Sequence, residues 1–447
     1  MKNAAPITGE LTQSFREGYA SNAHYRAMAN ALTRNGISGI ACDHGSLRET
    51  NYKFSLDIKT LPAAHQQSTG RCWLFAGLNV LREMVAKNYN LDKFELSQNY
   101  VAFWDKYEKV NYFLESVIDL IDRPVDDRHL CWVLSTGIQD GGQWDMFVNL
   151  VKKYGLAPKD AMAETHQSGN TWQMNALLNL KLRQYAARLQ AMYREGAGAA
   201  ALQAAKAEML REAYAFLRMN FGSPPEAFDF EYVNKDKKYG VRRGFTPLSF
   251  YKEYIGGALD DYVSVINAPT QDKPYGKTYT VDYIGNVVGG GEIFYLNLEM
   301  PELIELTLKQ LKDGEVVWFG SDVSMYGDRD SGVWNDRAYD YESAFSMDFS
   351  LSKELMLDYR QSAMNHAMVI TGVNLGADGA PNRWKIQNSW GEKSGCEGYY
   401  LMSASWFEKF VYQAVVHKKY LSAAQAEALG QAPIRLSPWD PMGTLAI

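Results

Sequence analysis

Residues 66–76 read Gln-Gln-Ser-Thr-Gly-Arg-Cys-Trp-Leu-Phe-Ala, and the sequence becomes helical at the cysteine, Cys72. After it, apolar residues recur at the i, i+3, i+4 spacing of one buried helix face: Leu74, Phe75, Leu78, Leu81 and Val85. Gly70 and Arg71 precede this pattern, so Cys72 is predicted to stand at the helix N-terminus. A helix N-terminus or a nearby imidazolium lowers a thiol pKa from about 8.5 into the range of about 3.5–7.5. Cys72 is therefore a candidate nucleophile.

Two downstream segments and one upstream residue supply the groups that a thiol nucleophile needs. His366 begins a strand-like run, and Asn388 follows a second run that is predicted to lie beside the first. The amide oxygen of Asn388 can then hold one ring N–H of His366, so that the other ring nitrogen faces the sulfur. Trp390 can cover this polar pair from water. Gln66 lies six residues before Cys72, and its amide and the Cys72 backbone N–H could both donate to a developing oxyanion.

The composition is that of an ordinary globular chain, and it excludes several classes of function. The chain has 447 residues, of which 46% are hydrophobic and 22% charged, and its net charge of −6 gives no support to binding of nucleic acid or an anionic membrane. No apolar run reaches the roughly 18 residues of a membrane span, and the first residues contain no signal-peptide core. We therefore expect a cytoplasmic protein that does not act at a membrane.

The four cysteines lie at positions 42, 72, 131 and 396, and no two of them form a CxxC pair. A zinc site is not expected from this spacing, and neither a metal nor a cofactor is predicted. Few scattered cysteines suit a reducing compartment with free thiols. Outside Cys72, we interpret the cysteines as small buried hydrophobic residues.

The hydrophobic periodicity predicts a helical first half and a strand-rich last third. Helices are expected over 97–120, 146–154, 303–311 and, as a hairpin broken near 195–198, over 175–220. Strands are expected at 54–58, 262–266, 278–281, 316–319, 368–373, 384–388 and 399–402. The segment from Gly430 contains several prolines and is expected to form an extended arm.

At these positions the sequence resembles a papain-type cysteine peptidase. The matching residues are Gln66, Cys72-Trp73, His366-Ala367 and Asn388-Ser389-Trp390-Gly391. Two features depart from that pattern. Thr69 replaces the first cysteine of the local signature, and His366 lies 294 positions after Cys72, whereas papain-like enzymes separate the two by roughly 130–150 residues. The surplus corresponds to the segment between about 105 and 320.

A more specific resemblance, to the bleomycin hydrolase and aminopeptidase C family, extends over nearly the whole chain and accounts for both departures. It rests on six stretches in order: Gly70–Phe75, Asp140–Met146, Asp272–Tyr275, Gly285–Gly290, Met364–Met368 and Pro438–Gly443. The resemblance implies an α+β, papain-like cysteine peptidase fold with a helical half, a strand-rich half, a large insertion and a C-terminal arm. The corresponding divisions are 1–104 with Cys72, 105–320 as an insertion with oligomerisation elements, 321–429 with His366 and Asn388, and 430–447 as the arm.

The resemblance also implies the activity. A cytosolic aminopeptidase is expected, assembled as a homohexamer, that removes N-terminal residues from peptides with a free amino group through a thioester intermediate. The arm is expected to lie in the cleft, with its terminal carboxylate anchoring the substrate amine. Candidate catalytic residues are Cys72, His366, Asn388 and Gln66, and candidate substrate-binding residues are Ala446, Ile447, Trp390 and Asn365.

Two other classes of function remain open at this point. A Cys–His acyltransferase would transfer the acyl group to amines, but it does not account for the arm. A catalytically weak, self-compartmentalising binding protein would retain the assembly without turnover. The residue after Ala446 leaves two alternatives open: because an alanine can be the working terminus in the family pattern, the enzyme removes Ile447 from its own chain, or the cavity accommodates Ile447.

Overall fold

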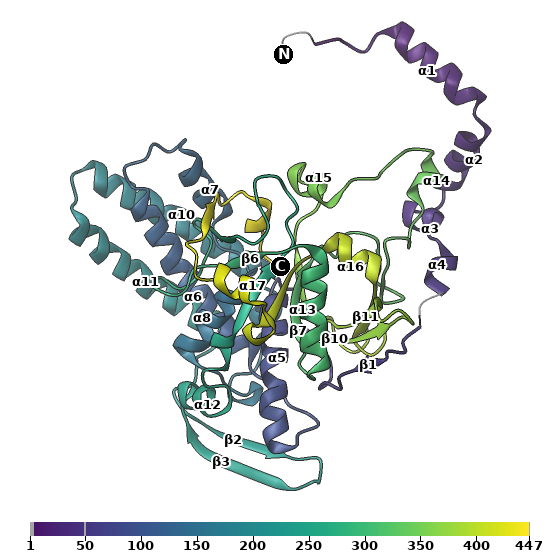
Figure 1. The fold of residues 1–447 in the computed structure, drawn as a ribbon. Coiled ribbons are helices and arrows are strands. Elements are labelled where there is room, and N and C mark those ends of the chain that lie inside the picture. Colours follow the sequence, from purple (N-terminus) through teal and green to yellow (C-terminus); the bar gives the residue numbers. More distant parts are fainter. Residues whose placement is uncertain (1–3, 49–50, 447) are drawn as a thin grey trace.

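The N-terminal helices project away from the rest of the molecule. The computed structural model describes residues 4–48 and 51–446 (Figure 1). It begins with α1 (Gly9–Ser21), α2 (Ala23–Leu32), α3 (Ile37–Ala41) and α4 (His44–Arg48). None of the residues of α1 or α2 is buried. Among the described helices far away in sequence, α2 and α3 pack mainly against α14 (Tyr341–Phe345). Residues 4–32, which we call the N-terminal arm, are therefore covered little by the rest of their own chain.

The helical half is built around α5, which begins at Cys72 as predicted and is buried along most of its length. The hairpin predicted over 175–220 is also confirmed, with its break at Glu195–Gly198, where Gly196 has a positive φ. Ser97 caps the helix that follows α5, as its side chain accepts from the N–H of Tyr100. The elements of this half are α5 (Cys72–Tyr89), α6 (Gln98–Asp119), α7 (Arg128–Thr136), α8 (Trp144–Tyr154), η1 (Lys159–Ala161), α9 (His166–Gly169), α10 (Trp172–Arg194) and α11 (Ala199–Phe221).

The second half is organised around one large sheet. Its strands are β1 (Leu56–Asp57), β4 (Tyr262–Ile266), β5 (Thr278–Val281), β6 (Tyr295–Asn297), β7 (Val317–Ser321), β8 (Gly327–Asp328), β9 (Val333–Trp334), β10 (His366–Leu375), β11 (Pro381–Gln387), β12 (Tyr399–Ser403), β13 (Val411–His417) and β14 (Ile434–Leu436). Their order is β14-β5-β6-β4-β13-β7-β10-β11-β12-β9-β8, with β1 paired to β10. A separate hairpin, β2 (Phe228–Val233) and β3 (Tyr239–Phe245), lies at the bottom of Figure 1.

Helices and short turns complete the second half. They are α12 (Pro247–Tyr254), η2 (Ala258–Asp261), α13 (Met300–Lys312), α14, α15 (Lys353–Asp358), α16 (Ala404–Phe410), η3 (Lys418–Tyr420), α17 (Ala423–Ala428) and η4 (Pro441–Gly443). None of the helices within the described ranges has the length and hydropathy needed to cross a membrane.

The middle of the sheet has a hydrophobic core on each face, and α5 lies on one of them. Along β7, Trp318 belongs to the same core as α5, whereas Val317 and Phe319 belong to a second core with residues of α13 and α16. This is the period-2 alternation of a strand that is buried on both faces. The Trp318 indole donates to the Trp73 carbonyl over 3.3 Å. The start of α5 is thereby fixed against β7 and its neighbour β10.

The C-terminal segment is less extended than expected. Part of it forms β14, which pairs in parallel with β5 and so joins the edge of the sheet, and η4 makes a turn near its end. Asp440 pairs with the buried Lys273 over 2.9 Å, which anchors the turn. Contacts with β5 and with the ammonium of Lys273, both far away in sequence, thus determine the conformation of this segment, for which the prolines alone predicted an extended chain.

The expected divisions at 104/105 and 320/321 fall inside α6 and β7. The segment between these positions therefore shares elements with both halves of the molecule, and the fourfold division stays a prediction.

Candidate active site

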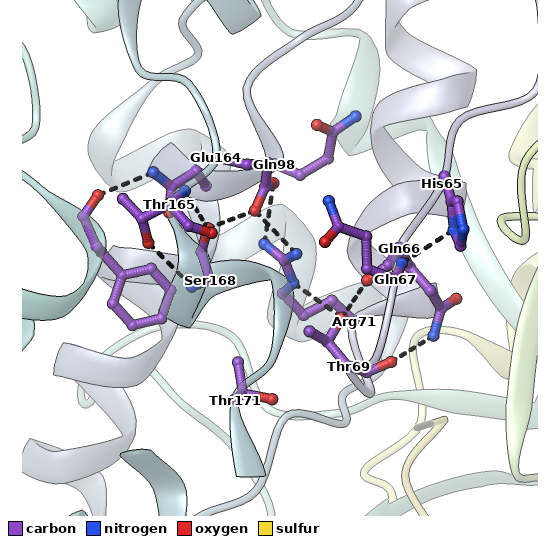
Figure 2. A network of polar contacts seen from close by, with 12 residues as sticks. His65, Gln66, Gln67, Thr69, Arg71, Gln98, Glu164, Thr165, Ser168 and Thr171 are labelled. Atoms are coloured by element: carbon purple, nitrogen blue, oxygen red, sulfur yellow. Dashed lines mark hydrogen bonds and ion pairs between the residues drawn. The ribbon is translucent and has the colours of Figure 1, made fainter. Parts of the chain in front are cut away.

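The loop before Cys72 is held by an ion pair between the buried Arg71 and the partly buried Glu164 (Figure 2). The Arg71 guanidinium donates to both carboxylate oxygens of Glu164, over 3.1 and 3.0 Å, and its Nε donates to the Thr69 hydroxyl over 3.1 Å. Thr69 in turn donates to the Gln66 carbonyl over 2.7 Å. The pairing with Glu164 is bidentate, which fixes orientation as well as distance. The loop therefore delivers Cys72 to the first position of α5 in one defined geometry.

Cys72 is fully buried, and its sulfur lies against the start of β10. The N–H of Ala367 points at Sγ over 3.4 Å. Burial raises the pKa of the Cys72 thiol to about 12, although the N–H groups of Ala367, Trp73 and Cys72 act in the opposite direction. The helix N-terminus alone therefore does not produce the low pKa expected from the sequence. A thiolate at this site requires a cationic partner, and the imidazole closest in the chain to Ala367 is His366.

His366 and Asn388 come together as the strand pattern predicted. The Nε2 of His366 lies 2.9 Å from the Oδ1 of Asn388, and because an amide oxygen only accepts, Nε2 carries the hydrogen. β10 and β11 are antiparallel neighbours, which brings these two residues to the same end of the sheet. Trp390 lies over the imidazole, with ring centroids 5.0 Å apart. Both His366 and Asn388 are almost completely buried.

Gln66 is fixed from two sides. Its backbone N–H donates to the Ser389 carbonyl over 2.8 Å, and its side-chain oxygen accepts from the Ser389 hydroxyl. Its Nε2 donates to the Thr69 carbonyl over 2.5 Å. A side-chain amide has two N–H donors, so one remains for a further acceptor. The amide is thus held rigidly between the loop that precedes Cys72 and the segment that follows Asn388.

Asp140 holds a second segment beside α5, and its importance was not recognised in the sequence. Its carboxylate pairs with Lys106 over 2.6 Å and accepts from the N–H of Gly70 over 3.0 Å, and it also accepts from the Thr171 hydroxyl and the Asn175 amide. Burial opposes ionisation, but Lys106 and these donors outweigh it and hold the pKa of Asp140 well below its usual range. The sequence did contain a signal for Asp140: it begins the stretch Asp140–Met146, one of the six on which the family resemblance rests, but no role was predicted for it.

The segment held by Asp140 pairs with the end of the chain. Lys109 donates to the carbonyls of Gln139 and Gly141, over 3.0 and 2.6 Å. Gly142 and Ala446 then exchange two backbone hydrogen bonds, of 3.1 and 3.3 Å, as an antiparallel bridge. A Cβ at Gly142 would lie 2.5 Å from the Trp73 ring, so the close approach of this segment to α5 requires glycine.

The four expected substrate-binding residues have different surroundings. Ala446 is fully buried in the bridge with Gly142, and Trp390 covers His366. The Asn365 amide is engaged with a neighbouring turn: it donates to Asp322 over 2.6 Å and accepts from the N–H of Val323 over 3.0 Å. Ile447 lies outside the described residues. A role of these residues in substrate binding stays a prediction.

The interpretation of the other cysteines was wrong. Cys131 and Cys396 are exposed and Cys42 is partly exposed, whereas Cys72 is the buried cysteine. The sequence around an isolated cysteine does not tell which face of its helix or strand is covered by the rest of the protein. The burial of these three cysteines could therefore not be deduced from the sequence. Cys131 therefore provides an accessible thiol as an internal reference for Cys72.

The sequence of this chain matches a known family over nearly its whole length. The model of the Peptidase C1-like family matches residues 6–443. Aminopeptidase C of Streptococcus thermophilus is 45% identical over 440 residues, which cover 98% of this chain and 99% of that protein. Aminopeptidase G of Lactobacillus delbrueckii subsp. lactis is 39% identical over 436 residues, again with 98% and 99% coverage.

A solved structure agrees with these relatives. The crystal structure of PepW from Lactobacillus rhamnosis HN001 has a TM-score of 0.97 and 46% identity, with 99% of this chain and 100% of that chain covered. The expected fold class, α+β and papain-like, and the expected class of enzyme, a cysteine-type aminopeptidase, are confirmed. The chain therefore belongs to the Peptidase C1-like family, in its bleomycin hydrolase and aminopeptidase C group.

Proposed function

We propose that this enzyme removes the first residue of peptides with a free amino group, with Cys72 as the nucleophile and His366 as its base. The observation that carries this proposal is the hydrogen bond of 2.9 Å between His366 and Asn388, next to a sulfur that lies 3.4 Å from the Ala367 amide. Asn388 would fix the ring so that its second nitrogen can exchange a proton with the thiol. As a member of a peptidase family, the protein acts on peptides.

The reaction would proceed in two halves. The Cys72 thiolate attacks the first peptide carbonyl, and the oxyanion is stabilised by the Cys72 backbone N–H and the second N–H of Gln66. His366 then protonates the leaving amine as the C–N bond breaks, which leaves a thioester on Cys72. Water, deprotonated by His366, hydrolyses the thioester and regenerates the thiol.

The C-terminal arm would restrict cleavage to the first residue. Ala446 occupies a backbone-pairing position on Gly142, beside the Trp73 ring. A substrate chain that extended in this direction would need the same backbone groups, so only a short acyl part fits in front of the arm. A carboxylate at the end of the arm would pair with the substrate ammonium, which favours a free N-terminus.

We also propose a cytoplasmic homohexamer. Its support is the N-terminal arm, whose exposed large apolar residues lie on and before α1: Ile7, Leu11, Phe15 and Tyr19. Exposed apolar side chains at helical spacing on a projecting helix are typical of a subunit contact. The exposed thiols of Cys131 and Cys396 suit a reducing compartment. The net charge of −6 gives no support to nucleic acid as a partner.

The test is a panel of fluorogenic aminoacyl and peptidyl substrates, each with a free and an N-acetylated amino group. Wild type should cleave only the free forms, and Cys72→Ala should cleave none, whereas the control Cys131→Ala should keep wild-type rates. A chain that ends at Leu436 should begin to cleave the acetylated forms. An unchanged ratio in the truncated enzyme would contradict the proposed role of the arm.

Product analysis separates hydrolysis from acyl transfer. With a free amino acid amide added in excess, a hydrolase should release mainly the free amino acid, whereas an acyltransferase would form the dipeptide amide. Predominant transfer to the added amide would overturn the proposed reaction.

A further inference from the structure

The leaving part of a substrate departs on the side of His366 and Trp390, opposite the C-terminal arm. This follows from the proposed function, in which His366 protonates the leaving amine and the arm closes the acyl side through Ala446 and Gly142. Trp390 lies over the imidazole, with ring centroids 5.0 Å apart. The exposed part of Trp390 therefore adjoins the path of the residues that follow the cleaved bond.

One cation lies beside Trp390. Arg329 lies in the turn between β8 and β9, and its guanidinium carbon is 4.6 Å from the centroid of the Trp390 ring. Arg329 is exposed, and within residues 4–48 and 51–446 its side chain forms no hydrogen bond or ion pair. Stacking on an indole face orients a guanidinium while its N–H edge stays available for an anion.

The nearby acidic residues do not neutralise Arg329 by direct contact. The carboxylate of Asp328 accepts from the N–H of Asp330 over 3.3 Å and from the Ser331 hydroxyl over 2.6 Å, so it stabilises its own turn. Asp330 is exposed and adjacent in sequence, and it reduces the local positive potential without forming an ion pair with Arg329 in the described chain. We therefore expect a moderate rather than a large electrostatic effect.

We propose that Arg329 binds the free α-carboxylate of a short leaving group and so makes dipeptides and tripeptides preferred substrates. This inference rests on the proposed function and names the substrate class of the same site. Arginine suits the ligand, because its planar fork matches a carboxylate with two parallel hydrogen bonds.

The distances fit one or two residues after the cleaved bond. The imidazole and the guanidinium carbon lie no farther apart than their two distances to Trp390 added together, which is under about 10 Å. A leaving amine within about 3 Å of the imidazole, followed by one residue of at most about 3.6 Å, can bring a carboxylate within hydrogen-bond reach of this guanidinium when the chain extends toward Arg329. A second residue adds the same length, which the flexible arginine stem can follow. Longer leaving groups carry their carboxylate past it.

The experiment compares Leu-Ala and Leu-Ala-Ala with their C-terminal amides, so that the two members of each pair differ in the carboxylate alone. In wild type, kcat/KM should be about tenfold higher for the acids, the size expected for one charge-assisted interaction. Arg329→Gln should bring the acid-to-amide ratio close to one. The control Arg211→Gln, which removes an exposed arginine of α11 whose side chain is 74% accessible, should leave the ratio unchanged. Added salt should lower the wild-type ratio.

Two results would overturn the inference: equal rates for acids and amides in wild type, or a preference for acids that persists in Arg329→Gln. Both are distinct from failure of the proposed function, in which neither acids nor amides with a free amino group would be cleaved. Thermal unfolding of each variant establishes that the fold is intact before the ratios are compared.

Discussion

Replacement of Asp140 by alanine should destabilise the protein and disorganise the active site together. The side chains of Asp140 and Lys106 are only 6% and 2% exposed, and their charged atoms lie 2.6 Å apart. Removal of one partner leaves the buried ammonium of Lys106 uncompensated, which typically costs about 3–5 kcal/mol. The unfolding entropy of 447 residues is about 0.9 kcal/mol per kelvin, so Tm should fall by about 3–5 °C.

The loss of activity should exceed what this change in stability explains. Asp140 accepts from the N–H of Gly70, two residues before the proposed nucleophile, and its carbonyl accepts from the Trp73 indole over 2.7 Å. A shift of about 1 Å in a positioned reacting group can cost around a hundredfold in rate. We therefore expect kcat/KM to fall about a hundredfold at a temperature where the variant is fully folded.

The assay is a thermal and urea unfolding series with parallel kinetics for Asp140→Ala, Asp140→Asn, Lys106→Met and the double variant Lys106→Met with Asp140→Asn. The asparagine keeps the acceptor for Gly70, and the double variant also removes the buried ammonium, so it should recover most of the lost stability. Because the pKa of Asp140 is held below its ordinary value of 3.8, its stabilisation is complete above that pH and is lost only as the pH falls further. The deficit should thus be constant between pH 5 and 8. A Tm change under 1 °C in Asp140→Ala, or a double variant that loses the sum of the single effects, would refute this reasoning.

Three further predictions follow from single residues. The rate of iodoacetamide labelling of Cys72 should rise with pH, with an inflection below neutral pH. In His366→Ala the inflection should move to higher pH, because burial raises the thiol pKa and the imidazolium is absent. The same curve in both proteins would exclude an ion pair between Cys72 and His366. Burial raises the pKa of Asp145 to about 7 from an ordinary 3.8, although the N–H of Phe294 acts in the opposite direction. The free energy of unfolding of the wild type should therefore fall by up to about 4 kcal/mol as the pH rises from 4 through 7, whereas that of Asp145→Asn should not. Parallel curves of Tm against pH for the two proteins would disprove this. Intact mass spectrometry should detect the loss of Ile447 from the wild type but not from Cys72→Ala, and a full-length mass in active wild type would contradict self-trimming.

Local sequence was sufficient for the elements that carry the candidate catalytic residues. The helix that begins at Cys72 is encoded by its apolar spacing. The strand that bears His366 is encoded by a run of apolar and β-branched residues, and the strand before Asn388 by alternation of apolar and polar residues. These patterns depend on neighbours within a few positions, so they are visible without a structure. The order of the four candidate catalytic residues then pointed to the family that the comparisons established.

The surroundings of those residues were decided by contacts between distant parts of the chain. The sequence could not reveal that Asp140 holds Gly70, that the last residues pair with Gly142, or that part of the arm joins the sheet as β14. It also predicted a low thiol pKa at Cys72 from the helix start and a nearby imidazolium, and could not show that burial acts in the opposite direction. Hydrogen bonding, desolvation and ion pairing depend on which groups meet in space, and this is set only when the helical half closes on the sheet.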